Sequence, residues 1–95
     1  MDTKEINKRL VLLGSYAMPP IVVNEIKHSD GDGLRSEYFG DGPVWQVFTQ
    51  GGLMGSLQVV EGEVHYYPSM KDSWRYDYET LGVLHLMVST IRENL

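Results

Sequence analysis

The side chains with the clearest potential for chemistry lie in a glycine- and aspartate-rich stretch of the chain. His28, Asp30 and Asp32 alternate there, so that one imidazole and two carboxylates could face a common point. Hard cations favour such oxygen-rich ligands. The stretch lacks the closing glutamate of an EF-hand loop, and Asp-Gly sequences are typical of turns. We therefore predict a structural turn and no metal site, with metal or small-molecule binding as an alternative.

A hydroxyl and an imidazole offer a second kind of chemistry. Ser56 and His65 fall on neighbouring predicted strands and could act as nucleophile and base. Ser56 lies in mid-strand, however, without the sharp turn that presents a hydrolase serine. The chain also has no cysteine, which excludes thiolate catalysis and disulfides. We predict no catalytic residue, no cofactor and no enzyme activity.

Both ends of the chain predict helices. Asp2 and Glu5 have the spacing of a capping box, ahead of a short amphipathic helix that Gly14 is expected to close. A longer helix is expected from about Tyr78 to Asn94, with Asp77 as its N-cap. Its predicted apolar arc contains Leu81, Val83, Leu84, Met87, Val88, Ile91 and Leu95.

The segment between the helices predicts strands separated by turns. The expected strands are Ile21–Lys27, Arg35–Phe39, Val44–Thr49, Leu53–Val60 and Glu63–Tyr67. Glu61-Gly62 fits a two-residue hairpin loop that pairs Val60 with Glu63. A three-residue loop, Gln50–Gly52, is expected before it, because that register gathers the apolar side chains on one face. The inner face then carries Trp45, Val47, Leu53, Leu57, Val59, Val64 and Tyr66.

These elements predict one α+β domain over residues 1–95. An antiparallel meander of four to five strands is flanked by an N-terminal and a longer C-terminal helix packed on one face, in the order α-β-β-β-β-β-α. This architecture resembles that of many small inhibitors, immunity proteins and phage-encoded proteins that act on a host.

The sheet face away from the helices is the predicted binding surface, because it is more apolar than a solvated face needs to be. Together with the acidic turns, this face is expected to form one contact surface. The predicted partner-binding residues are Phe48, Met54, Tyr67, His65, Asp30, Asp32, Glu37 and Asp41.

Charge favours a basic protein as the partner. The net charge is −5, and residues 25–63 contain seven acids and two bases, so this segment carries the whole excess. Nucleic acid and anionic membranes are disfavoured, since no basic stripe is present. We expect a module that inhibits or neutralises a basic partner, in the manner of an antitoxin or immunity protein.

Two further expectations complete the prediction. A homodimer of structural role is the main alternative, because an outer sheet face or a free edge strand often pairs with a second copy. The N-terminus lacks the features of a signal peptide and the chain has no cysteine, so a cytoplasmic location is expected.

Overall fold

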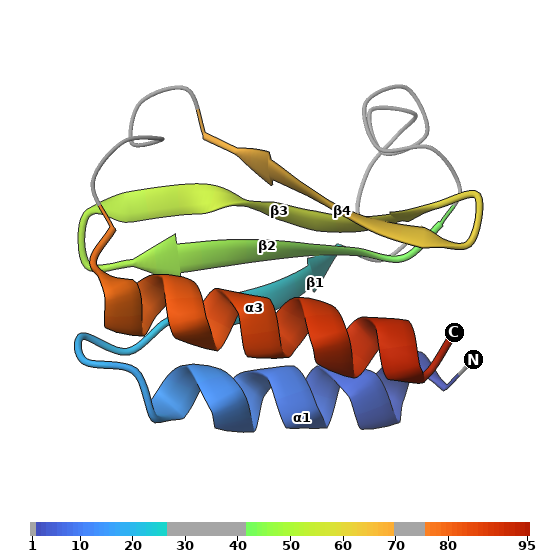
Figure 1. The fold of residues 1–95 in the computed structure, drawn as a ribbon, viewed down its shortest axis with the longest axis horizontal. Helices are drawn as coiled ribbons and strands as arrows, with labels where there is room; N and C mark the ends of the chain where they lie inside the picture. Colours follow the sequence, from blue (N-terminus) through green and yellow to red (C-terminus); the bar gives the residue numbers. More distant parts are fainter. Residues whose placement is uncertain (1, 27–41, 70–75) are drawn as a thin grey trace.

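The sheet is a meander of four antiparallel strands in the order β1-β2-β3-β4, with two helices on one of its faces (Figure 1). The computed structural model describes residues 2–26, 42–69 and 76–95. Their elements are α1 (Thr3–Ser15), β1 (Val22–Ile26), β2 (Val44–Thr49), β3 (Gly52–Val60), β4 (Glu63–Pro68) and α3 (Tyr78–Glu93). The predicted α+β class, the antiparallel meander and the terminal helices are confirmed. The predicted strand Arg35–Phe39 lies outside the described residues, which form four strands.

The first helix begins at its predicted N-cap and ends one residue beyond the glycine that was expected to close it. The Asp2 carboxylate accepts hydrogen bonds from the backbone N–H of Lys4 and of Glu5, at 3.1 and 3.4 Å. Gly14 does not close the helix, which continues to Ser15. Gly14 is buried, and a Cβ at this position would collide with the backbone of Ile21. Gly14 therefore lets the returning chain pass close to the last turn of α1.

The second helix starts at its predicted N-cap. The backbone N–H of Thr80 donates to the Asp77 carboxylate at 2.8 Å, and the hydrogen bonds from Thr80 lower the pKa of Asp77. Most of the predicted apolar arc faces the core, but Leu81 is 37% exposed, and the buried position beside it is Thr80. Of the helices described, neither has the length and apolar content needed to cross a bilayer.

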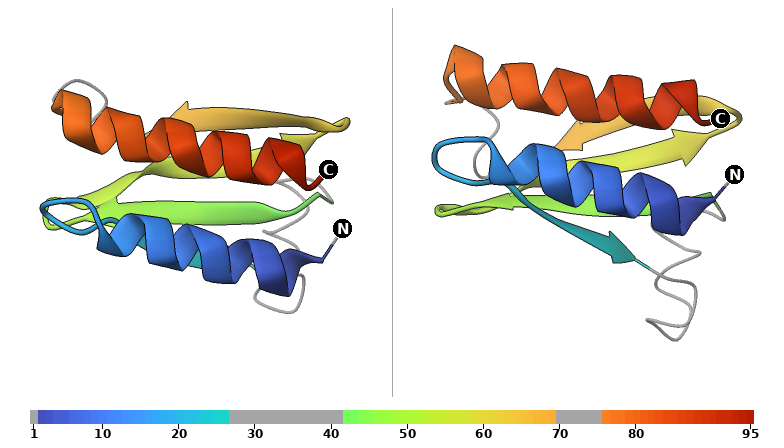
Figure 2. Two further views of the ribbon diagram at one scale, coloured as in Figure 1. Left: turned by 60° about the horizontal axis from the view of Figure 1, so that its bottom comes forward. Right: turned by 90° about the horizontal axis from the view of Figure 1, so that it is seen from below.

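The two helices lie side by side and antiparallel across the sheet (Figure 2). The first contacts β1, the second contacts β4, and they contact each other. Trp45 is the largest fully buried side chain, and its indole Nε1 has no hydrogen-bond partner among the described residues. The core between helices and sheet contains Ile6, Leu10, Ala17, Ile21, Val23, Trp45, Val47, Met54, Leu57, Leu84, Met87 and Ile91.

The hairpin between β3 and β4 forms as predicted. Val60 pairs with Glu63, and the register continues without a break to Gly55 and Pro68. Glu61 and Gly62 occupy the two loop positions with φ of 51° and 79°. Positive φ at both positions is the geometry of a type I′ turn, whose twist matches that of the strands it joins.

The hairpin between β2 and β3 corrects one prediction. Trp45 pairs with Leu57 and Val47 with Gly55, as expected, but the register shifts by one residue so that Phe48 pairs with Leu53. The connection is therefore a two-residue turn followed by a β-bulge at Met54 rather than a three-residue loop. The bulge turns Met54 into the core, where it is fully buried, and leaves Leu53 36% exposed. The predictions that Met54 faces outward and Leu53 inward are wrong.

Candidate functional site

The face of the sheet opposite the helices holds the candidate site. Side chains alternate between the two faces of a strand. Because Val23, Trp45, Val47 and Leu57 point toward the helices, the residues between them point away. We call this side the outer face. Its residues are Val22, Asn24, Ile26, Val44, Gln46, Phe48, Leu53, Ser56, Gln58, Val60, Glu63, His65 and Tyr67.

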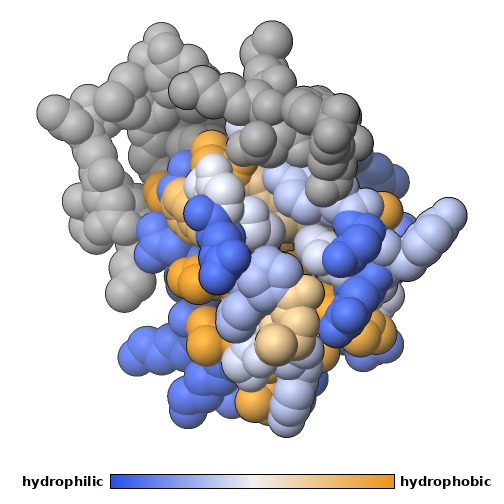
Figure 3. Space-filling model, turned by 90° about the vertical axis from the view of Figure 1, so that its left-hand side faces the viewer, coloured by the Kyte–Doolittle hydropathy of each residue, from blue (hydrophilic) through white to orange (hydrophobic). Residues whose placement is uncertain are grey.

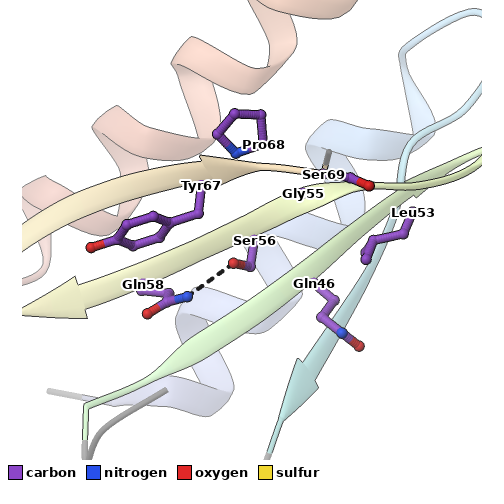
Figure 4. Close-up of a pocket in the computed structure, with 8 residues that line it drawn as sticks. All are labelled: Gln46, Leu53, Gly55, Ser56, Gln58, Tyr67, Pro68 and Ser69. Atoms are coloured by element: carbon purple, nitrogen blue, oxygen red, sulfur yellow. Dashed lines mark hydrogen bonds between the residues drawn. The ribbon is translucent and has the colours of Figure 1, made fainter. Parts of the chain in front are cut away.

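A pocket of about 310 Å³ opens on the outer face (Figure 4). At its centre the Gln58 Nε2 donates a hydrogen bond to Ser56 Oγ at 3.0 Å. Both side chains belong to β3 and both residues are only 9% exposed. This hydrogen bond holds the Gln58 amide with its NH₂ toward Ser56. The lining residues are Gln46, Leu53, Gly55, Ser56, Gln58, Tyr67, Pro68 and Ser69.

Three outer-face side chains follow one another along β4 beside the pocket. The rings of His65 and Tyr67 stack, with centroids 6.1 Å apart and 26° between their planes. The His65 Nε2 lies 3.5 Å from a carboxylate oxygen of Glu63. Tyr67 is 47% exposed and forms part of the pocket wall. This row therefore presents an aromatic surface that ends in one carboxylate.

The inner side of the same strand pair is closed by Tyr66. Its hydroxyl donates to the Met54 carbonyl oxygen at 2.9 Å, and its ring passes over Gly55. Burial, together with the neighbouring Tyr76, raises the pKa of Tyr66 to about 12. This packing fixes β4 against β3 directly behind the pocket.

The predicted partner-binding residues divide into three groups. Phe48, His65 and Tyr67 lie on the outer face as predicted, and the last two are in contact. Met54 cannot contact a partner because the bulge buries it in the core. The four acidic residues Asp30, Asp32, Glu37 and Asp41 lie outside the described residues, as does His28.

Several pocket residues were not singled out by the sequence. Gln46 and Gln58 were placed on the outer face, but an amide gives no pattern that marks a site. Leu53 was assigned to the other face, and Pro68 and Ser69 lie just beyond the predicted strand end. The alternation along β3 was the available signal, and the bulge interrupts it at the edge of the pocket.

The hydroxyl and imidazole considered for catalysis are in different environments. Ser56 pairs with Tyr67 across the strands, whereas His65 pairs with Gln58. The Ser56 hydroxyl accepts a hydrogen bond from Gln58, whereas His65 contacts Glu63 and Tyr67. Within the part of the chain that is described, no three His, Asp or Glu side chains cluster closely enough to hold a metal ion.

Charge is distributed unequally between the two layers. Every lysine and arginine of the described residues is on a helix: Lys4, Lys8, Arg9 and Arg92. The described strands and hairpin turns contain Glu25, Glu61 and Glu63 and no lysine or arginine. The sheet layer is therefore neutral to acidic over its described length.

A separate group of exposed apolar side chains lies at the end of the molecule where α1 stops and α3 starts. Tyr16 and Met18 follow α1, and Tyr78 and Leu81 are in the first turn of α3; all four are exposed. Figure 3 views this end and shows hydrophobic residues interspersed with hydrophilic ones.

Compared with known proteins, the chain matches no family model, no curated protein and no solved structure.

Proposed function

We propose that this chain is a protein-binding module that docks a basic partner protein on its outer face. The observation that carries the proposal is the pocket, whose wall combines the exposed ring of Tyr67 with neutral amide and hydroxyl groups. Concave sites with a few convergent polar groups are the usual places where a side chain or ligand is anchored. Aromatic side chains in such places often dominate binding energy.

An arginine of the partner is the side chain that suits this pocket best. Its guanidinium can donate to the amide oxygens of Gln46 and Gln58 and stack on the ring of Tyr67. Its aliphatic stem can lie along Leu53. The outer face supports this choice electrostatically, because it carries the carboxylate of Glu63 and its described residues include no lysine or arginine.

Within this class of function, an inhibitor or an antitoxin-like neutraliser is the role we propose. A small acidic protein of net charge −5 can cover a basic surface and approach it quickly through long-range attraction. The chain has no cysteine, which fits a reducing compartment such as the cytoplasm.

Titration with small arginine compounds tests the pocket directly. We expect N-acetyl-arginine amide to shift the side-chain amide NMR signals of Gln46 and Gln58. The citrulline analogue keeps the shape of arginine and removes its charge, so it should cause smaller shifts. Equal shifts with both compounds would show that charge is not recognised.

Two tyrosine variants supply the matched comparison. Tyr67→Ala should abolish the response to arginine, because it removes the ring from the pocket wall. Tyr16→Ala removes an exposed ring at the end of α1, away from the outer face, and should leave the response unchanged. At the level of the partner protein, Tyr67→Ala should weaken the complex, and added salt should slow its association. A response that survives in Tyr67→Ala contradicts the proposal.

A further inference from the structure

The outward edge of β4 carries backbone groups that the described sheet does not use. In a two-residue hairpin the residues that flank the loop, here Val60 and Glu63, exchange hydrogen bonds, and bonded and non-bonded pairs then alternate. Glu63, His65 and Tyr67 therefore bond to β3, whereas Val64, Tyr66 and Pro68 direct their backbone groups away from it. The hydrogen bond from Ser69 N–H to the Met54 carbonyl oxygen, at 2.9 Å, continues this alternation.

This edge lacks most of the features that keep edge strands from pairing. It contains no lysine or arginine, and its register with β3 has no bulge. Proline stands only at its end, at position 68, where the missing N–H would have pointed outward. Among the described residues, no partner accepts from the N–H groups of Val64 or Tyr66.

We infer that β4 pairs with β4 of a second copy of this chain, antiparallel and about a twofold axis at His65. In this register Val64 pairs with Tyr66 of the second copy and Tyr66 with its Val64, so all outward N–H groups of both strands find a carbonyl oxygen. A twofold axis at Tyr66 would set Val64 opposite Pro68, which has no N–H to donate to the Val64 carbonyl oxygen. An axis at Val64 would set Tyr66 opposite Gly62, which is in the turn at φ 79°.

The side chains agree with this register. On the outer face Glu63 would lie opposite Tyr67 of the second copy, so a carboxylate would meet a phenol hydroxyl. On the inner face Val64 and Tyr66, both half-buried, would cover each other across the junction. The twofold axis is perpendicular to the sheet, so both helix layers would lie on one side and both outer faces would form one continuous surface.

A proline variant at position 64 isolates the backbone contribution. Val64→Pro removes an outward donor from each strand, and proline is tolerated at an edge position whose N–H faces solvent. Val64→Ala removes similar side-chain packing and keeps the donor. We expect light scattering over a range of protein concentrations to show a dimer for the wild type and for Val64→Ala. Dimerisation of Val64→Pro should be weaker by roughly ten- to hundredfold, the effect of losing one hydrogen bond in each half.

Charge at position 65 tests the symmetry without relying on proline. His65 would face its own copy in a non-hydrogen-bonded pair, where side chains are closest. His65→Glu and His65→Lys should therefore both weaken the dimer, because each opposes like charges, while His65→Gln should not. Circular dichroism of each variant confirms that it is folded.

This inference does not rest on the proposed function, because Val64→Pro leaves every pocket side chain in place. A wild type that stays monomeric at millimolar concentration overturns it, as does equal dimerisation of Val64→Pro and Val64→Ala. Opposite effects of Glu and Lys at position 65 also overturn it, because they indicate a strand from a different protein. If the wild type dimerises but does not bind arginine, only the pocket proposal is contradicted.

Discussion

Adding one methyl group at Gly55 should destabilise the fold more than its size suggests. Gly55 pairs with Val47 on one side and Pro68 on the other, so a Cβ here would point toward the helix layer. It would stand 2.5 Å from the Tyr67 carbonyl oxygen, 2.6 Å from the Tyr66 hydroxyl oxygen and 2.8 Å from Tyr66 Cε1. The first contact is with backbone, which cannot move without disturbing the strand pair.

The expected magnitude has two parts. Overpacking of a well-packed site typically costs about 1–3 kcal/mol. The Tyr66 ring must also rotate away, which breaks its 2.9 Å hydrogen bond to the Met54 carbonyl oxygen and adds about 1 kcal/mol. Gly55→Ala should therefore lower the free energy of unfolding by roughly 2–4 kcal/mol. For a domain of this size, that corresponds to a fall in Tm on the order of 10–30 °C.

Urea and thermal unfolding followed by circular dichroism measure this effect, and Gly82→Ala is the matched control. Gly82 is exposed in the middle of α3, and a Cβ there has no atom within 4 Å. Alanine is the better helix former, so this control should gain about 0.5–1 kcal/mol. If Gly55→Ala unfolds within about 0.5 kcal/mol of the wild type, the typical range for a surface substitution, the inferred packing of Tyr66 is refuted.

Two further perturbations test the same strand pair. Because the pKa of Tyr66 is raised to about 12, from an ordinary value of 10.0, its stabilising contribution is complete below pH 10 and is lost as the pH rises toward 12. The free energy of unfolding, measured in urea across this pH range, should fall less steeply for Tyr66→Phe than for the wild type. The same pH dependence for variant and wild type would contradict the raised pKa of Tyr66. At the hairpin turn, Gly62→Ala should cost about 1–2 kcal/mol, because φ there is 79°. Gly51, in the neighbouring turn, does not have a left-handed φ, so Gly51→Ala should lower the free energy of unfolding by less. Equal losses of stability in the two variants would argue against the type I′ turn.

The two hairpins show how far the sequence could predict the sheet. Glu61-Gly62 and the alternation around it predicted the complete β3–β4 register, because the turn type and the burial pattern agree. In the β2–β3 hairpin, a three-residue loop and a two-residue turn with a bulge give the same pairing of Val47 with Gly55. Alternation therefore could not distinguish them. The difference appears only at Leu53 and Met54, which exchange faces.

The candidate site was predicted in part for the same reason. Phe48, His65 and Tyr67 were placed on the outer face because they alternate with core residues, which is a local property of the strands. The pocket is not local, since it needs β2, β3 and β4 side by side and a specific hydrogen bond between Ser56 and Gln58. No single strand carries that information.

The sequence by itself determined the N-caps of both helices, the order of the described strands and, apart from the bulge in β3, the face that each paired strand buries, since these follow from side-chain periodicity and turn chemistry. Tertiary structure alone decided the burial of Met54, the close passage of Ile21 over Gly14 and the hollow on the outer face. The physical reason is that periodicity specifies directions along one segment. Which neighbour fills the space in each direction depends on segments that are distant in the chain.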